Sequence, residues 1–146
     1  MAKLGRYSAD RKKIKAIAAA ETLVLTAADC GTVFTLAGGT GTVAITLPTA
    51  AAAGAGWWCK FVLLSNKGGN DATITAATAG TIIAANFGGL DLADATANLV
   101  SNASGDAIAF KANGALAGDQ IEVLCTGEKM LIQAFSVGNS TDIVVS

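Results

Sequence analysis

Histidine is absent from this chain of 146 residues, and side chains that usually carry catalysis are correspondingly few. Without histidine, a Ser-His-Asp or Cys-His arrangement is excluded, and the commonest general base near neutral pH is missing. Carboxylate pairs occur at Asp91 and Asp94 and at Glu122 and Glu128, but we expect all four to be solvated side chains in or beside turns. The sequence therefore predicts a protein that is not an enzyme.

Cysteine is also scarce. Three residues lie at wide spacings: Cys30, Cys59 and Cys125. A structural zinc site needs four Cys or His ligands at close spacing, so none is predicted. Asp91 and Asp94 are too few carboxylates for a calcium site, and the glycine-rich segments 38–41 and 54–56 match no phosphate-binding loop. We predict no metal or cofactor, and three buried free thiols in a reducing compartment.

Long hydrophobic runs are lacking as well, although hydrophobic residues make up 52% of the chain. The longest run, Trp57 to Leu64, is interrupted by Lys60. It falls short of the ~18 to 20 apolar residues that a membrane span needs. The charged N-terminus is not followed by the apolar segment of a signal peptide. The sequence predicts a soluble protein made in the cytoplasm, with one domain and no membrane partner.

The net charge of −1 conceals an uneven distribution. Residues 1–20 carry six cations against Asp10 alone, which gives +5, and the rest of the chain carries four lysines against ten carboxylates, which gives −6. The six cations are Lys3, Arg6, Arg11, Lys12, Lys13 and Lys15. We therefore divide the chain into a basic N-terminal arm, residues 1–20, and a body, residues 21–146. The arm is either an anchor onto a negatively charged or sheet-edged surface, or a solvated tail.

Part of this arm has the pattern of a short helix. Ser8 is a candidate N-cap, Asp10 falls in the first turn, and Ile14, Ile17 and Ala18 fall on one side at helical spacing. A helix of ~12 residues is marginal alone in water. We expect it to become ordered only against the body or a partner.

From Glu21 onward, short alternating segments separated by turn residues indicate β-strands. The predicted strands are 22–26, 32–36, 42–47, 57–64, 72–76, 81–84, 98–101, 107–111, 120–125, 129–137 and 141–145. Residues 86–97 are expected to be irregular or a short helix. This spacing favours an all-β fold, an antiparallel β-sandwich or jelly-roll-like domain over residues 21–146.

The phrases GTVFTL, GTVAITL and DATITA suggest a rival architecture, a Thr-rich solenoid of the ice-binding kind. A solenoid needs a fixed period sustained over at least three repeats. The intervals between these phrases are irregular, so the sandwich is preferred.

The core is expected around residues 42–64, where an alternating strand, the only proline (Pro48) and both tryptophans follow one another. Trp57 and Trp58 are adjacent, so in a strand they point to opposite faces. One is predicted to reach the core. The other is predicted to lie at a contact between subunits or under the connection formed by residues 49–55.

The segments LTAADCGTVFTL and VAITLPTAAAAGAGWWCKFVLL, followed by a Gly/Asn turn and ATITAATAGTI, resemble a pattern in virion proteins of tailed bacteriophages. The opening AKLGRYSADRKKI is similar to the N-terminus of small structural proteins of phages of marine bacteria. This resemblance covers the arm and roughly residues 22–83. It implies a capsid decoration (cement) protein: a β-sandwich subunit, often trimeric, that sits on the outside of the head and stabilises the capsid.

On this resemblance we predict a homo-oligomer, a trimer, that binds the major capsid protein on the virion surface after assembly in the host cytoplasm. The residues predicted to contact the capsid are Arg6, Tyr7, Arg11, Lys12, Lys13 and Lys15. Trp57 or Trp58 is predicted to line the contact between subunits.

Two alternatives remain open from the sequence. The first is a tail-fibre or head-fibre module, in which the sandwich is a receptor-binding or spacer domain. The second is a nucleic-acid-binding protein that uses the basic arm, although the run of cations is short and Tyr7 is its only aromatic residue.

Overall fold

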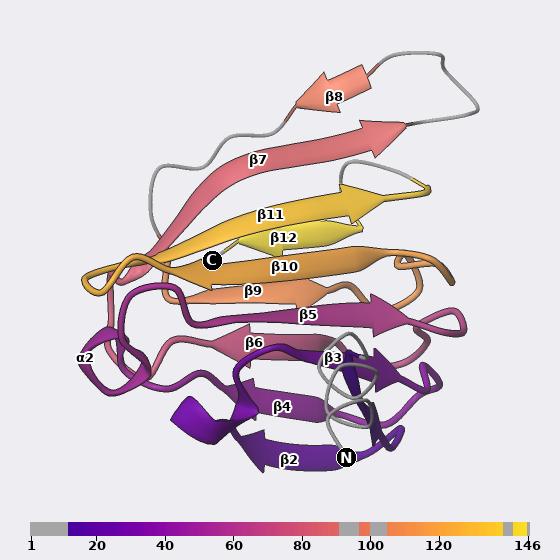
Figure 1. The fold of residues 1–146 in the computed structure, drawn as a ribbon. Coiled ribbons are helices and arrows are strands. Elements are labelled where there is room, and N and C mark those ends of the chain that lie inside the picture. The colour runs from indigo at the N-terminus through magenta and orange to yellow at the C-terminus, as the bar shows by residue number, and fades with distance from the viewer. Residues whose placement is uncertain (1–11, 91–96, 100–104, 139–141, 146) are drawn as a thin grey trace, which may run out of the picture.

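A computed structural model describes residues 12–90, 97–99, 105–138 and 142–145. These residues form two β-sheets, with sheet A in front of sheet B in the view of Figure 1. Sheet A has seven strands in the order β1 (Lys13–Ile17), β3 (Thr32–Leu36), β5 (Trp58–Leu63), β10 (Gln120–Cys125), β11 (Met130–Ser136), β7 (Ile82–Leu90) and β8 (Ala97–Leu99). Sheet B has five strands in the order β12 (Ile143–Val145), β9 (Ala107–Phe110), β6 (Ala72–Thr75), β4 (Val43–Thr46) and β2 (Glu21–Val24).

The prediction of an all-β sandwich is confirmed, but the expectation of antiparallel pairing is only partly right. Strand β10 pairs antiparallel with β5 and β11, and β9 pairs antiparallel with β6 and β12. Five other pairs are parallel: β1 with β3, β3 with β5, β2 with β4, β4 with β6, and β7 with β11. A jelly roll is an antiparallel double Greek key, and this mixed pairing differs from it.

The first six strands alternate between the two sheets, which explains the parallel pairing. Odd-numbered strands β1, β3 and β5 stack side by side in sheet A, and β2, β4 and β6 stack in sheet B. The chain therefore winds through three stacked coils, as in a β-solenoid. Lys13 pairs with Thr32, and Thr32 pairs with Cys59. The first coil therefore contains fewer residues than the second. The irregular intervals that counted against a regular solenoid reflect turns of different length between stacked strands. The sandwich prediction holds, and the first half of the sandwich is built from coils that were not expected from the sequence.

The predicted helix in the basic arm is wrong over the residues that the structure describes. Residues 13–17 form β1, a strand at the edge of sheet A that pairs with β3. Ile14 and Ile17, expected on one side of a helix, lie on opposite faces of this strand: Ile17 is buried and Ile14 is 72% exposed. The backbone of β3 offers β1 a full ladder of hydrogen bonds, which outweighs the weak propensity of a short, isolated helix. Ser8 and Asp10 lie outside the described residues.

The region after Gly80 also differs from the sequence prediction. Strand β7 continues to Leu90, where irregular structure or a helix was expected from residue 86. It pairs with β11 through a register shift between Ile132 and Gln133. Figure 1 shows β7 and β8 extending sheet A beyond the last strand of sheet B. This long strand therefore depends on its partner β11 and not on its own residue pattern.

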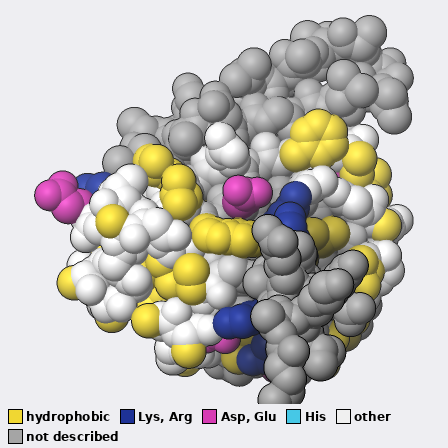
Figure 2. Space-filling model, in the orientation of Figure 1, with side chains coloured by type: hydrophobic (Ala, Val, Ile, Leu, Met, Phe, Trp, Pro, Cys, Tyr) yellow, Lys and Arg dark blue, Asp and Glu magenta, His cyan; other side chains and the backbone are white. Residues whose placement is uncertain are grey.

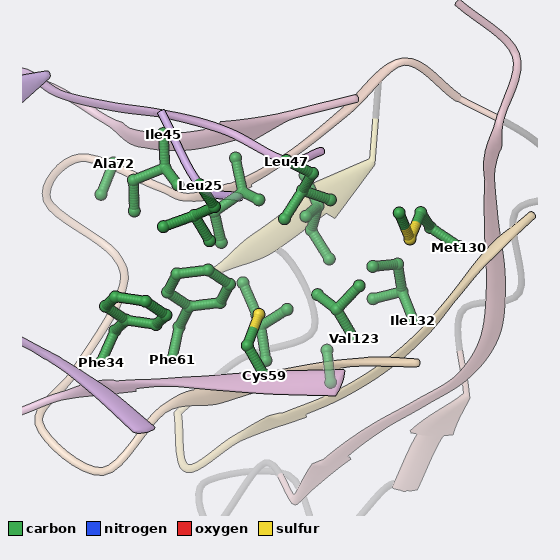
Figure 3. Packing of buried hydrophobic residues seen from close by; sticks show 14 of the residues in the cluster. Leu25, Phe34, Ile45, Leu47, Cys59, Phe61, Ala72, Val123, Met130 and Ile132 are labelled. Atoms are coloured by element: carbon green, nitrogen blue, oxygen red, sulfur yellow. The ribbon is translucent and has the colours of Figure 1, made fainter. Parts of the chain in front are cut away.

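The core lies between the sheets and is built from alternate residues of each strand. Phe34 and Phe61, neighbours on β3 and β5, stack with ring centroids 5.3 Å apart. Figure 3 shows them, with Cys59 and Val123 of the same sheet, pointing toward Leu25, Ile45 and Leu47 from the other layer. The inward alternation of β5 makes Cys59, Phe61 and Leu63 inaccessible to solvent. The core is therefore centred where the sequence predicted it.

Two turns at one end of the sandwich are joined by a buried lysine. Lys67, in the turn 65–71, is only 2% exposed, and its Nζ donates to the carbonyl oxygens of Gly39, at 3.1 Å, and Gly41. Burial lowers the pKa of Lys67, and the nearby charge of Asp71 acts in the opposite direction. Gly41 has no room for a side chain, because a Cβ there would lie 2.3 Å from the carbonyl oxygen of Ala19. The turns are thus held to each other by hydrogen bonds from a buried lysine.

A buried carboxylate fixes the neighbouring loop. Asp119 is fully buried and accepts hydrogen bonds from the backbone N–H groups of Leu116, at 3.0 Å, and Val137, at 2.7 Å. Burial raises the pKa of Asp119, the backbone bonds and a bond from Ser136 lower it, and the charge of Asp142 raises it, with a net upward shift. Asp119 therefore connects the loop before β10 to the end of β11.

Replacing Asp119 tests this role. We expect Asp119→Ala to lower the free energy of unfolding by about 2–4 kcal/mol, because two part-buried backbone N–H groups lose their buried acceptor. Asp119→Asn keeps one carbonyl oxygen and should cost less. Urea denaturation followed by circular dichroism measures both variants.

The pH dependence gives a second readout of the same residue. Because its folded-state pKa is raised, Asp119 contributes stability that is full below the ordinary carboxyl pKa of about 3.9 and is lost as pH rises through the raised value. Asp119→Asn should remove this contribution, so the stability difference between wild type and variant should change between pH 3 and pH 7. An unchanged difference would show that burial does not perturb this carboxyl group.

Candidate interaction surface

The two tryptophans point to opposite sides of sheet A, as the sequence predicted. Trp57 is 3% exposed, belongs to the core cluster, and donates from its ring N–H to the carbonyl oxygen of Thr26 at 3.2 Å. Trp58 begins β5 and is half-buried on the outer face. Trp57 is thus already covered by its own chain and is not available to line a contact between subunits. Only Trp58 remains a candidate for that role.

The basic residues predicted to contact a partner divide into two groups. Arg6, Tyr7 and Arg11 lie outside the described residues. Lys12, Lys13 and Lys15 are described, and all three are exposed. The Nζ of Lys12 lies 5.9 Å from the centroid of the Trp58 ring, within the range of a cation–π contact. The structure therefore brings one predicted arm residue together with the predicted interface tryptophan.

Lys13 and Lys15 occupy an unusual place in the sheet. Lys13 pairs with Thr32 and Lys15 with Phe34, whose side chains face the core. In β1 these positions are exposed, because the strand is at the sheet edge. Lysines on an edge strand also discourage uncontrolled strand pairing with other molecules. The edge is thus both basic and open to solvent.

The outer face of sheet A carries more apolar side chains than the sequence analysis anticipated. Partly exposed apolar residues come from four neighbouring strands: Val33, Trp58, Val62, Leu124, Leu131 and Phe135. Leu124 is 43% exposed and Phe135 is 42% exposed. The space-filling view in Figure 2 shows a band of hydrophobic side chains across this side of the molecule, with an acidic and a basic side chain close together beside it.

A signal for this face was present in the sequence. Residues 57–64 are apolar on both alternations, which is typical of a strand covered on two sides. One of these alternations forms the predicted core. In the structure the second alternation lies on the outer face of sheet A, where Trp58 and Val62 lie beside Lys60 and are partly exposed.

Candidate chemistry is sparse in the described residues. They contain no group of three His, Cys, Asp or Glu side chains that could hold a metal ion. Cys59 and Cys125 are buried free thiols, as predicted, whereas Cys30 is partly exposed. Burial, with smaller contributions from Asp29, Cys30 and Glu122, raises the pKa of the Cys59 thiol, which keeps it protonated and unreactive.

The carboxylate pairs give no paired site. Glu122 lies in β10, and Glu128 lies in the turn between β10 and β11. Both are exposed. Asp91 and Asp94 lie outside the described residues.

Comparisons with protein-family models, curated proteins and solved structures find no match for this chain. No helix among the described residues is long and apolar enough to cross a membrane.

The different surroundings of the two tryptophans can be measured directly. In Trp58→Phe, the remaining Trp57 should emit at short wavelength and be quenched weakly by acrylamide, because the core excludes the quencher. In Trp57→Phe, the remaining Trp58 should give a quenching constant several times larger when measured at low protein concentration. Equal quenching in the two variants would contradict the assignment of faces.

Proposed function

We propose that this chain is a non-enzymatic structural protein of a tailed-phage virion that decorates and stabilises the outside of the capsid as a homo-oligomer. The resemblance of its N-terminal half and arm to phage virion proteins supports this function. The fold is compatible with this function: it is a small β-sandwich whose described residues hold no group of three His, Cys, Asp or Glu side chains. The major capsid protein as partner is part of this proposal. The trimeric state rests on the resemblance alone, and the two-fold contact inferred below is an alternative to it.

The observation that carries the proposal is the exposed basic edge of sheet A. Lys12, Lys13 and Lys15 follow one another on or beside β1, while the remainder of the chain is acidic. An edge strand with exposed cations can meet an acidic surface through charge and through its unpaired backbone groups. Repeated over many subunits of a capsid lattice, weak contacts of this kind give firm attachment.

The register of β1 sets the design of the test. Removing residues 1–15 would delete part of a strand that pairs with β3 and would confuse binding with folding. Two separate changes avoid this: deletion of residues 1–11, and the double substitution Lys13→Gln/Lys15→Gln within an intact strand. Lys129→Gln is the control for the loss of an exposed lysine outside the anchor. Lys129 lies in the turn between β10 and β11, which β3 and β5 separate from β1 in the sheet, and its Nζ bond to the Gly80 carbonyl oxygen at 2.9 Å is lost in the variant.

Binding to empty heads of the phage is measured by co-sedimentation at low and high salt. We expect both altered proteins to keep the β-sheet circular dichroism spectrum and to lose at least about tenfold in apparent affinity at low salt, with a smaller loss at high salt because salt screens exposed charges. Lys129→Gln should bind like wild type. Unchanged binding by both altered proteins would refute the anchor role. A salt-dependent mobility shift of DNA, without head binding, would favour the nucleic-acid alternative instead.

A further inference from the structure

We propose that the outer face of sheet A is a two-fold contact between two copies of this chain, in which Lys60 of each copy faces Glu122 of the other. The contact is centred on β5 and β10, which lie side by side in the middle of the sheet. Its central side chains are Trp58, Lys60 and Val62 from β5 and Leu124, Glu122 and Gln120 from β10.

The register of the two strands determines how these side chains are arranged. Lys60 is directly opposite Glu122, Trp58 is opposite Leu124, and Val62 is opposite Gln120. Because directly opposed residues project from the same side of a sheet, the outer face carries three cross-strand pairs in successive rows. The only two charged residues among these six lie in the middle row.

Lys60 and Glu122 do not satisfy each other within one chain. The only ion pair between described residues joins Lys111 and Asp71, so the Lys60 and Glu122 side chains stay beyond ion-pair distance. Each is therefore available to a charge that approaches from outside. A lysine and a glutamate side by side form a pattern that is complementary to its own rotated copy.

A two-fold axis that runs parallel to the strands, midway between β5 and β10, produces this complementarity. Rotation about such an axis places β5 of one copy over β10 of the other, at unchanged height along the strands. Lys60 then faces Glu122 of the second copy, and the reverse pair forms by symmetry, as in any isologous interface. In the row before, Trp58 faces Leu124, so apolar side chains meet apolar side chains.

The apolar content and the net charge of this face both favour a second copy as its occupant. Leu124 is 43% exposed and Phe135 is 42% exposed, whereas a second sheet packed at about 10 Å would cover them. An acidic partner would leave Glu122 facing like charge, and a basic partner would do the same to Lys60. A surface with one charge of each sign, placed symmetrically about the proposed axis, fits its own copy best.

This contact does not rest on the proposed capsid role and is separable from it. It uses the outer face of sheet A, whereas the proposed capsid anchor uses the basic edge at β1. The purified chain should form the contact without any capsid present.

Charge exchange tests the proposal. Sedimentation equilibrium at several protein concentrations should show a monomer–dimer equilibrium for the wild type. Lys60→Glu and Glu122→Lys should each raise the dissociation constant at least about tenfold, because each places like charges across the axis twice. The double variant Lys60→Glu/Glu122→Lys restores opposite charges across the same axis and should return the dissociation constant to within about threefold of wild type.

Controls separate association from folding. Like charges on neighbouring strands also repel within one chain, so thermal unfolding at a concentration where every variant is monomeric measures that effect alone. Leu124→Glu should also weaken association, whereas Val144→Glu, at a comparably exposed residue of sheet B, should not. A monomeric wild type, a trimer that Lys60→Glu does not alter, or a double variant as weak as the single ones would each overturn the two-fold contact. Each of these results would leave the head-binding experiment unaffected.

Discussion

The pairing of β5 on both of its edges is the constraint on which the rest of the structure depends. On one edge it pairs in parallel with β3, the last step of the stacked coils, and on the other it pairs antiparallel with β10. The two halves of the chain use different topologies, and this strand makes them one sheet. Its inward residues Cys59, Phe61 and Leu63 belong to both halves, since Phe61 stacks on Phe34 while its neighbour in β10 is Ile121. A single core results because the side-chain alternation of β5 is shared by both neighbours.

The end of the sandwich near the turn 65–71 shows how unequal coils are held in register. The turns that connect these stacked strands differ in length. Their backbone carbonyl groups lie outside the strand ladders and need hydrogen-bond donors from elsewhere. Lys67 supplies a donor to two of them, those of Gly39 and Gly41. Burying a charged lysine costs free energy unless its ammonium group is hydrogen-bonded. The two carbonyl groups therefore offset that cost, and they fix the position of the Lys67 side chain.

The sequence predicted the elements whose pattern is local and missed those that depend on a distant partner. The bounds of β3 and β10 agree with the prediction, because alternating side chains and turn residues define them within a few positions. The opposite burial of Trp57 and Trp58 follows from strand geometry alone. Residues 13–17 have a pattern that suits either a helix or a strand. They form a strand because the backbone of β3 is available for pairing. Parallel pairing depends on the path of the chain between strands, which no local pattern records. The apolar outer face is visible in residues 57–64, which are apolar at most positions on both sides of the strand. Burial of one side alone offered an explanation of this run, so the second side was missed.

The basic edge and the apolar face belong to the same sheet and adjoin where Lys12 lies over Trp58, but Lys13 and Lys15 lie on the edge strand itself. A strand edge presents backbone groups in the plane of the sheet, whereas a face presents side chains perpendicular to it. Face-to-face association through β5 and β10 would therefore leave the outer edge of β1 accessible. Two copies joined in this way would carry their basic edges on opposite sides of the two-fold axis, because β1 and β3 lie on one side of β5 only. A pair of subunits would then present two anchors about one sheet width apart, so that two weak contacts would be linked in one particle wherever the partner offers sites at that spacing.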